Sequence, residues 1–153
     1  IGFDGVLYFY ADTERIRDVR MEKELLRQLE WKLDRLQPYV VKADPSLIEQ
    51  ITHDDMLRGM TIAANGFYGP QGRQLRLSLA DPQLNQKIQA FDYEGHQITN
   101  YEMESSALAG LAAMMGHRAM TVCCIIAGRV DKNMNTDYAS ALDNLIDTVV
   151  ERI

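Results

Sequence analysis

The sequence predicts an α/β protein, a layered fold in which helices flank a central parallel or mixed sheet. Apolar, strand-like runs alternate along the chain with segments whose apolar residues recur at helical spacing. One run, 118–128 (RAMTVCCIIAG), is apolar nearly throughout, as are strands that a parallel sheet buries on both faces. Together these observations indicate strands alternating with helices in one layered domain.

The first part of the chain predicts a strand, a helix and a second, short strand. Residues 5–11 (GVLYFYA) combine aromatic and apolar side chains, which is typical of a buried strand. Leucines recur at helical spacing among the charges of 14–36, so this range is expected to be an amphipathic helix that Pro38 ends. Residues 38–43 (PYVVKA) predict the short strand.

A capped helix, a strand and a loop are expected next. Asp44 is a suitable N-cap and Pro45 fits the first turn, so 44–57 is predicted to be helical. Residues 60–65 (MTIAAN) predict a strand. Residues 65–73 (NGFYGPQGR) predict a loop, because three glycines and one proline punctuate them.

The remaining elements are two helices around a strand, then the long apolar run and a last helix. Residues 81–95 begin with another Asp-Pro pair and close on a glycine, which favours a helix. Residues 98–102 (ITNYE) predict a strand. The small residues of 104–116 predict a helix that packs close to the sheet and ends at a glycine. The last helix is expected from about Thr136 onwards.

Composition limits the classes of partner. The chain has 153 residues, of which 46% are hydrophobic and 25% charged, enough for one domain with one sizeable core. Its formal charge of −6 disfavours binding to a nucleic-acid backbone or an anionic membrane, and no apolar run reaches the roughly 20 residues of a bilayer span. Cys123 and Cys124 are adjacent in an apolar run, which suits small buried side chains in a reducing compartment, so the cytoplasm is expected.

Two glutamates precede the predicted helix of 104–116. A carboxylate in the first turn stays ionised because the helix dipole favours it. An ionised carboxylate accepts hydrogen bonds, so Glu104 could bind the two adjacent hydroxyl groups of a ribose, with Glu102 assisting from the strand end. The alternative is that Glu104 only favours the helix start while Glu102 faces solvent. Spacing alone favours this alternative.

The loop of 65–73 carries groups that could read a planar base. Gln71 supplies an amide and Arg73 a fork of donors, which match a ring with carbonyls and an N–H, such as uracil. Phe67 or Tyr68 could stack on the face of that ring. The alternative is a solvated surface turn in which Phe67 anchors the core. Taken alone, the segment favours this alternative too.

In this order and spacing, the two segments resemble the nucleoside phosphorylase family, most closely its uridine phosphorylase branch. The resemblance is carried by FYGPQGR and by ITNYEMESSALAGLAAMMGHRAMTVCCIIAGR, and it is densest over 61–129. It implies that Glu104 binds the 2′ and 3′ hydroxyls, that Met103 lies against the sugar ring and that Glu102 supports them.

The same resemblance implies a uracil site. Gln71 and Arg73 would read the uracil edge and act in catalysis, with Phe67 stacked on the ring. Purine-preferring relatives carry a Ser-Asp pair where this chain has Ala-Gly-Arg, which supports a pyrimidine. Gly128 stands where the branch usually has Asn. The implied substrate-binding residues are Phe67, Tyr68, Gln71, Arg73, Glu102, Met103, Glu104, Ile126 and Arg129.

The implied reaction is phosphorolysis of uridine to uracil and ribose 1-phosphate, in pyrimidine salvage, by a homo-oligomer (a dimer or a hexamer). Arg73 and Gln71 would stabilise the negative charge on the departing uracil, and Glu104 would place a negative charge near the developing sugar cation. Inorganic phosphate is the co-substrate. No cofactor or metal is expected, because phosphate is already an anion and the histidines have no metal-like spacing.

The family's phosphate-binding turn lies in the half that precedes these motifs, and this chain opens almost directly into a strand-like run. We therefore expect 1–153 to be the C-terminal part of a single nucleoside phosphorylase domain whose N-terminal half is absent, and the fragment alone to be inactive. Two alternatives stay open. A nucleoside hydrolase on the same fold would carry an acidic group near Gly128 and Arg129, which argue against it. A non-catalytic nucleoside-binding or scaffold homologue, or an inactive fragment, is favoured by the missing phosphate half.

Overall fold

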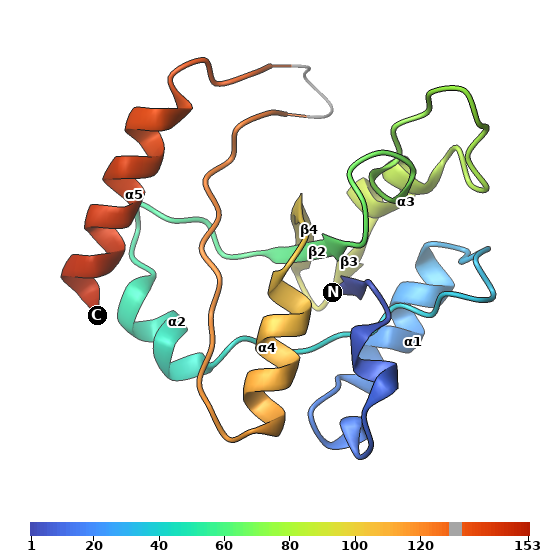
Figure 1. Ribbon diagram of the computed structural model, residues 1–153, viewed down its shortest axis with the longest axis horizontal. Coiled ribbons are helices and arrows are strands. Elements are labelled where there is room, and N and C mark those ends of the chain that lie inside the picture. The colour runs from blue at the N-terminus through green and yellow to red at the C-terminus, as the bar shows by residue number, and fades with distance from the viewer. Residues whose placement is uncertain (129–132) are drawn as a thin grey trace.

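The computed structural model describes residues 1–128 and 133–153, in which helices flank one four-stranded sheet (Figure 1). The strand order is β1-β2-β4-β3. The strands are β1 (Gly2–Phe3), β2 (Met60–Ala64), β3 (Asp92–Tyr93) and β4 (His96–Glu102). β2 runs parallel to β1 and to β4, whereas β3 pairs antiparallel with β4. This mixed sheet confirms the predicted fold class.

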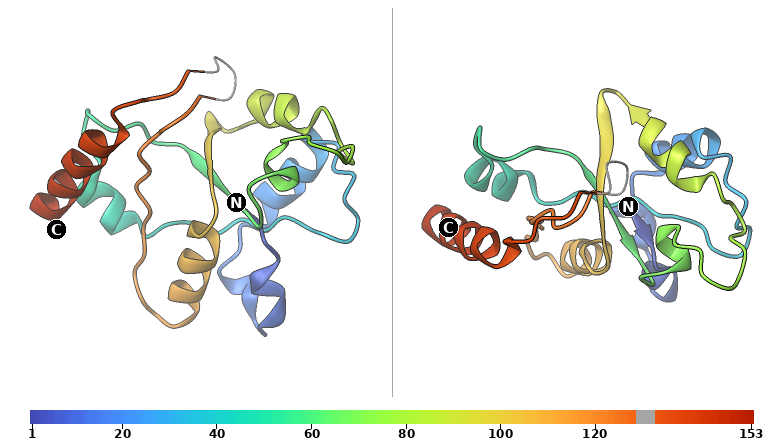
Figure 2. Two further views of the ribbon diagram at one scale, coloured as in Figure 1. Left: turned by 45° about the horizontal axis from the view of Figure 1, so that its top comes forward. Right: turned by 90° about the horizontal axis from the view of Figure 1, so that it is seen from above.

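Helices cover both faces of the sheet. The α-helices are α1 (Val19–Gln28), α2 (Pro45–Ile51), α3 (Leu84–Ala90), α4 (Ser105–Met114) and α5 (Tyr138–Arg152). Figure 2 shows α1 and α3 on one side of the sheet and α4 on the other. Short 3-10 turns are η1 (Val6–Phe9), η2 (Thr13–Arg15) and η3 (Gly69–Gln71). None of the helices in the described ranges is both long and apolar enough to cross a bilayer.

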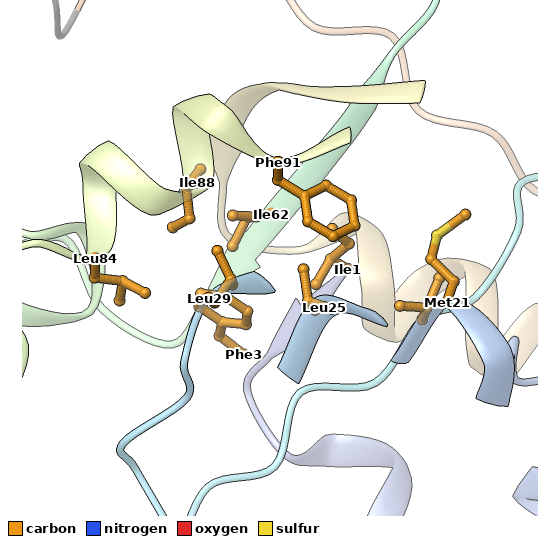
Figure 3. Packing of buried hydrophobic residues seen from close by; sticks show 10 residues of the cluster. Ile1, Phe3, Met21, Leu25, Leu29, Ile62, Leu84, Ile88 and Phe91 are labelled. Carbon is orange, nitrogen blue, oxygen red and sulfur yellow. The ribbon is translucent and has the colours of Figure 1, made fainter. Parts of the chain in front are cut away.

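The hydrophobic core lies between α1, α3 and one face of the sheet (Figure 3). Leu25 of α1, Leu29 directly after that helix and Ile62 of β2 are fully buried, and Leu84 and Ile88 of α3 close the cluster. Because side chains alternate along a strand, the neighbours of Ile62 face α4 instead. The small side chains of α4 allow the helix to pack closely against this face of the sheet, as the sequence predicts.

The close approach of α4 depends on one glycine. A Cβ built on Gly110 would lie 2.8 Å from Leu7 of η1, closer than side-chain carbons approach one another. The predicted glycine stop is also present, since Gly116 has φ +76° and His117 N donates to Ala112 O at 2.8 Å. The small residues of 104–116 therefore serve packing, and a glycine does follow the helix end.

The cap predicted for the second helix is present. Asp44 Oδ1 accepts a hydrogen bond from Leu47 N at 3.1 Å, and Pro45 is the first helical residue of α2. Four further predictions are confirmed, with bounds shifted by a few residues. They are the strands of 60–65 and 98–102, the helix of 104–116 and the C-terminal helix.

Residues 5–11 do not form the predicted strand. β1 ends at Phe3, Gly5 adopts the left-handed conformation with φ 72°, and Asp4 Oδ1 accepts a hydrogen bond from Val6 N at 2.8 Å. This local bond turns the chain into η1. The apolar residues of η1 suit a strand equally well, so the pattern alone missed the turn.

The predicted helix of 14–36 is shorter than expected. Asp18 lies inside the charged run and caps α1 by accepting a hydrogen bond from Met21 N at 3.1 Å. The chain leaves the helix before Glu30, whose φ is 46°. The later leucines therefore follow the helix instead of extending it.

Two further segments differ from prediction. In 38–43, two isolated bridges form in place of the predicted strand. Tyr39 pairs with Gly2 and Val41 with Arg17, so neither pairing extends into a ladder. In 81–95, helix α3 is followed at once by β3, and Gly95 lies in the turn of the β3–β4 hairpin with φ +82°. The glycine that suggested a helix stop is a hairpin residue.

The predicted buried strand of 118–128 is wrong. The segment runs as a coil between α4 and α5 (Figure 1), and an isolated bridge joins Ala127 to Met134. Ile125 and Ile126 are 56% and 45% exposed. Apolar composition fits a strand only when a neighbouring strand supplies hydrogen bonds, and this segment takes part in no ladder with the sheet.

Candidate functional site

The two candidate segments leave the sheet at the same edge. β2 and β4 are parallel neighbours, and Ala63 of β2 pairs with Glu102 of β4. The loop of 65–73 and the acidic segment therefore both follow carboxyl ends of strands, where open α/β sheets bind their ligands. β1 ends there as well, because Phe3 pairs with Ala64.

The carboxylate of Glu102 holds the start of α4. Its Oε2 accepts hydrogen bonds from the backbone nitrogens of Glu104 and Ser105, both at 2.7 Å, and its Oε1 accepts one from Ser105 Oγ at 2.5 Å. These bonds satisfy N–H groups that have no partner within the helix, where the dipole also favours a negative charge. Glu102 is thus not the solvent-facing strand residue of the alternative interpretation.

Glu104 occupies the N-cap position without capping the helix. Its side chain is exposed and makes no capping hydrogen bond, and the preceding Met103 is 39% exposed. The structural task that the alternative interpretation gave to Glu104 is performed by Glu102. The Glu104 carboxylate is consequently placed to accept hydrogen bonds from a ligand.

Arg73 brings the predicted base-reading residues into one cluster. Its Nη1 donates to Phe67 O at 2.5 Å and to Gln71 Oε1 at 2.7 Å, and its guanidinium carbon lies 3.6 Å from the centroid of the Phe67 ring. The backbone nitrogen of Arg73 donates to Tyr68 O at 2.9 Å. The loop is therefore a closed turn with its amide, guanidinium and ring side chains adjacent.

Burial divides this cluster into a fixed part and an accessible part. Gln71 is only 4% exposed, whereas Phe67 and Tyr68 are 52% and 56% exposed. The two rings meet edge to face with centroids 5.4 Å apart. Phe67 is thus not the core anchor of the alternative interpretation, and both rings offer surface for stacking.

A pocket of about 1170 Å³ adjoins the loop. Tyr68 and Arg73 line it, together with leucines that include Leu33 and Leu36. Among the described residues, Glu102 to Glu104 are not part of its lining. Tyr68 and Arg73 therefore border an open space that the acidic segment does not share.

The coil after α4 runs beside the end of β4. Burial raises the pKa of the Cys123 thiol, a hydrogen bond with Asn100 lowers it in part, and the charge of Glu102 raises it further. Ile126 O accepts a hydrogen bond from Asn135 N at 2.7 Å. Arg129 lies outside the described residues. Nowhere in 1–128 and 133–153 are three or more His, Cys, Asp or Glu residues placed to hold a metal ion.

A buried polar network behind α4 escaped the sequence prediction. Tyr39 OH donates to Asp4 Oδ1 at 2.6 Å, Ser106 Oγ donates to Asp4 Oδ2 at 2.5 Å, and the two hydroxyl oxygens are 3.1 Å apart. Burial and the bond to Asp4 raise the pKa of Tyr39. The aspartate directly after β1, followed by a glycine, is the sequence signal for this turn. The apolar composition of 5–11, which predicts a strand, hides that signal.

Three findings relate this chain to known proteins. The sequence model of the Phosphorylase superfamily matches residues 8–151. Uridine phosphorylase A of Schistosoma mansoni is 39% identical over 80 residues, which are 51% of this chain and 26% of that protein. A crystal structure of a Trypanosoma brucei nucleoside phosphorylase, described as showing uridine phosphorylase activity, matches with a TM-score of 0.82 and 25% identity over 99% of this chain. The match covers 54% of the Trypanosoma brucei chain, so this chain spans about half its length.

Proposed function

The chain belongs to the phosphorylase superfamily, and on that premise we propose that the protein phosphorolyses uridine to uracil and ribose 1-phosphate. The cluster of Arg73, Gln71 and Phe67 carries the proposal, because its donors and ring match the edge and face of a pyrimidine. The two relatives support it: one is named a uridine phosphorylase and the other is described as having that activity.

Uracil binds against the exposed rings of the loop. Phe67 or Tyr68 stacks on its face, the donors of Arg73 meet its carbonyl oxygens, and the buried Gln71 holds Arg73 in place from behind. Since Gln71 is buried and bonded to Arg73, these donors are oriented before the substrate arrives. Donors fixed in this way stabilise charge as it develops on the departing base.

The ribose binds at the start of α4. Glu104 accepts hydrogen bonds from the 2′ and 3′ hydroxyls, Met103 lies against the sugar ring, and Glu102 holds Glu104 in place through its backbone nitrogen. The negative charge of Glu104 also favours the positive charge that builds on the sugar. Ile126 and Arg129 complete the proposed substrate contacts.

The reaction exchanges one bond at C1′ for another. The bond from C1′ to the uracil nitrogen breaks with its electron pair leaving on uracil, and a phosphate oxygen forms the new bond to C1′. The phosphate proton ends on uracil, which balances the reaction. Phosphate is itself the nucleophile, so neither a metal nor a cofactor has a part in the proposed chemistry.

We also propose the protein's setting from the family and from the free thiols. Cys123 and Cys124 are both free, which supports a reducing compartment, the cytoplasm. There the reaction serves pyrimidine salvage, and the assembly is a homo-oligomer, either a dimer or a hexamer. Mass photometry of the full-length protein distinguishes these two assemblies from a monomer.

Substrate preference tests the pyrimidine assignment. Full-length protein is incubated with phosphate and either uridine or inosine, and the free base is quantified by chromatography. We expect uracil to form at least about tenfold faster than hypoxanthine, since a site built to bond one base edge rejects a base that leaves its polar groups unpaired. Equal rates, or faster release of hypoxanthine, would contradict a uracil site at Arg73 and Gln71.

A further inference from the structure

We infer that Asn85 is a positioning residue that fixes the base loop relative to the acidic segment. Asn85 lies on α3, where its Nδ2 donates to Gln71 O at 3.3 Å and its Oδ1 accepts from Tyr101 OH at 2.7 Å. Tyr101 directly precedes Glu102 on β4. One amide thus bridges the two segments that the proposed function assigns to base and sugar.

The loop is built to approach this amide closely. A Cβ at Gly72 would lie 2.2 Å from Asn85 Nδ2, and the φ of Gly72 is +75°, a conformation that favours glycine. A larger residue at this position would displace either the Asn85 amide or the loop, and either shift breaks the bond between them. The glycine between Gln71 and Arg73 therefore leaves room for the Asn85 amide to contact the loop.

The bridge rests on a rigid support. Leu84 and Ile88, one and three residues from Asn85 on α3, are buried in the hydrophobic core. Tyr101 is also packed against that core, and it pairs in register with Ile62 of β2. Asn85 itself is only partly exposed.

Both ends of the asparagine amide are used. The NH₂ group donates to a carbonyl while the oxygen accepts from a phenol, so an aspartate keeps only the second bond and an alanine keeps neither. The inferred role rests on the proposed function. Asn85 would act on catalysis by holding the base segment and the sugar segment at the separation of one nucleoside. A misplacement of about 1 Å costs on the order of 100-fold in rate.

Amide hydrogen exchange tests the bridge without reference to activity. Full-length Asn85→Ala is compared with the parent and with Gln28→Ala. Gln28 is a matched control because its amide also bonds backbone groups in both directions, to Asp92 O at 2.8 Å and Asp92 N at 3.2 Å. We expect Asn85→Ala to speed exchange in both 65–73 and 102–106, and Gln28→Ala to affect only the region of Asp92. Faster exchange in only one of the two segments, or in neither, overturns the inference.

Kinetics then separates positioning from general stability. We expect Asn85→Ala to lower kcat for uridine about tenfold or more, Asn85→Asp and Tyr101→Phe to lower it less, and Gln28→Ala to leave it unchanged. The double variant of Asn85→Ala with Tyr101→Phe should be no slower than Asn85→Ala, because both remove one shared bond. Fully additive losses, or an equal loss in Gln28→Ala, contradict the bridge. A parent protein that releases no uracil refutes the proposed function instead, and the exchange result still decides on Asn85.

Discussion

The carboxylate of Glu102 accepts a hydrogen bond from the backbone nitrogen of Glu104 at 2.7 Å, so one glutamate of the pair holds the other in place. Two residues of the same type, separated by one position, thus have different tasks. Glu102 accepts hydrogen bonds from the backbone at the start of α4, whereas the Glu104 side chain makes no capping hydrogen bond there. This division leads to predictions that separate stability from binding.

Glu102→Gln should destabilise the protein. The variant removes a charge that the helix dipole favours, and it weakens the bonds from the N–H groups of Glu104 and Ser105, because an amide oxygen is a weaker acceptor than a carboxylate oxygen. We expect a loss of up to about 1 kcal/mol in the free energy of unfolding, the usual contribution of a negative charge at a helix start. Urea unfolding measures it. An unchanged midpoint would show that the charge of Glu102 contributes nothing to stability.

Glu104→Gln should weaken nucleoside binding and leave stability unchanged. Its side chain caps nothing, but an amide accepts hydrogen bonds from the ribose hydroxyls less strongly than a carboxylate does. Calorimetric titration with uridine measures the affinity, and urea unfolding serves as the control. Equal affinity for uridine in variant and parent would remove Glu104 from the sugar site.

Arg73→Ala should lower uridine phosphorolysis by about 100-fold or more, the loss typical of removing a donor that stabilises developing charge. Arg20→Ala is the matched control, because Arg20 is an exposed arginine of α1 and does not line the pocket beside Arg73. We expect initial rates for Arg20→Ala to equal those of the parent. Unchanged kinetics in Arg73→Ala would place the guanidinium outside the site.

Tyr39→Phe should destabilise the protein through the loss of its hydroxyl group, since the ring that packs in the core is kept. The hydroxyl bonds to Asp4 and lies against Ser106, and Tyr39 is fully buried. Losing a bond to a charged group costs about 1–3 kcal/mol. Tyr10→Phe is a control because Tyr10 is 51% exposed. Equal unfolding midpoints for the two variants would contradict a stabilising network at Asp4.

The ion pair of Asp81 and Lys87 predicts a pH-dependent stability. Burial alone would raise the pKa of Asp81, but hydrogen bonds from Lys87 Nζ and Gln83 N outweigh it, and the pKa lies below its ordinary value. A carboxyl with a depressed folded-state pKa contributes stability above its unfolded pKa, near 4, and loses that contribution as the pH falls through the folded value. Asp81→Asn should therefore be less stable than the parent at pH 7.

The difference between Asp81→Asn and the parent should shrink as the pH falls below about 4 and then disappear, because the parent carboxyl becomes neutral as well. Urea unfolding at a series of pH values measures it. A difference of constant size down to low pH would mean that the asparagine acts through packing and not through the lost charge.

Much of the fold follows from local patterns. Local patterns predict β2, β4, α4 and α5, because each has a periodicity or an end signal that does not depend on distant residues. They also predict the start of α2 through the cap at Asp44, but α2 ends at Ile51 and not at Leu57 as expected. The errors have two causes. The apolar run of 118–128 forms no ladder with the sheet, which depends on distant residues. The turn at Asp4 and Gly5 is local, but the residues that follow it have a composition that suits a strand equally well.

The candidate site divides in the same way. Residue types and their order indicate Gln71, Arg73 and Glu104, and the parallel pairing of β2 with β4 places both segments at one edge of the sheet. The sequence could not show that Arg73 stacks on Phe67 or that Asn85 joins Gln71 to Tyr101, because these contacts depend on how α3 packs. The roles of the site residues and the single-domain interpretation of 1–153 stay predictions.

Release of uracil from uridine by the full-length protein, measured with and without inorganic phosphate, tests the central claim most directly. We predict release only when phosphate is present, with ribose 1-phosphate formed in equal amount to uracil. Release at the same rate without phosphate would mean that water attacks the sugar and the protein is a hydrolase. No release under either condition would contradict catalysis and leave a protein that binds nucleosides without cleaving them.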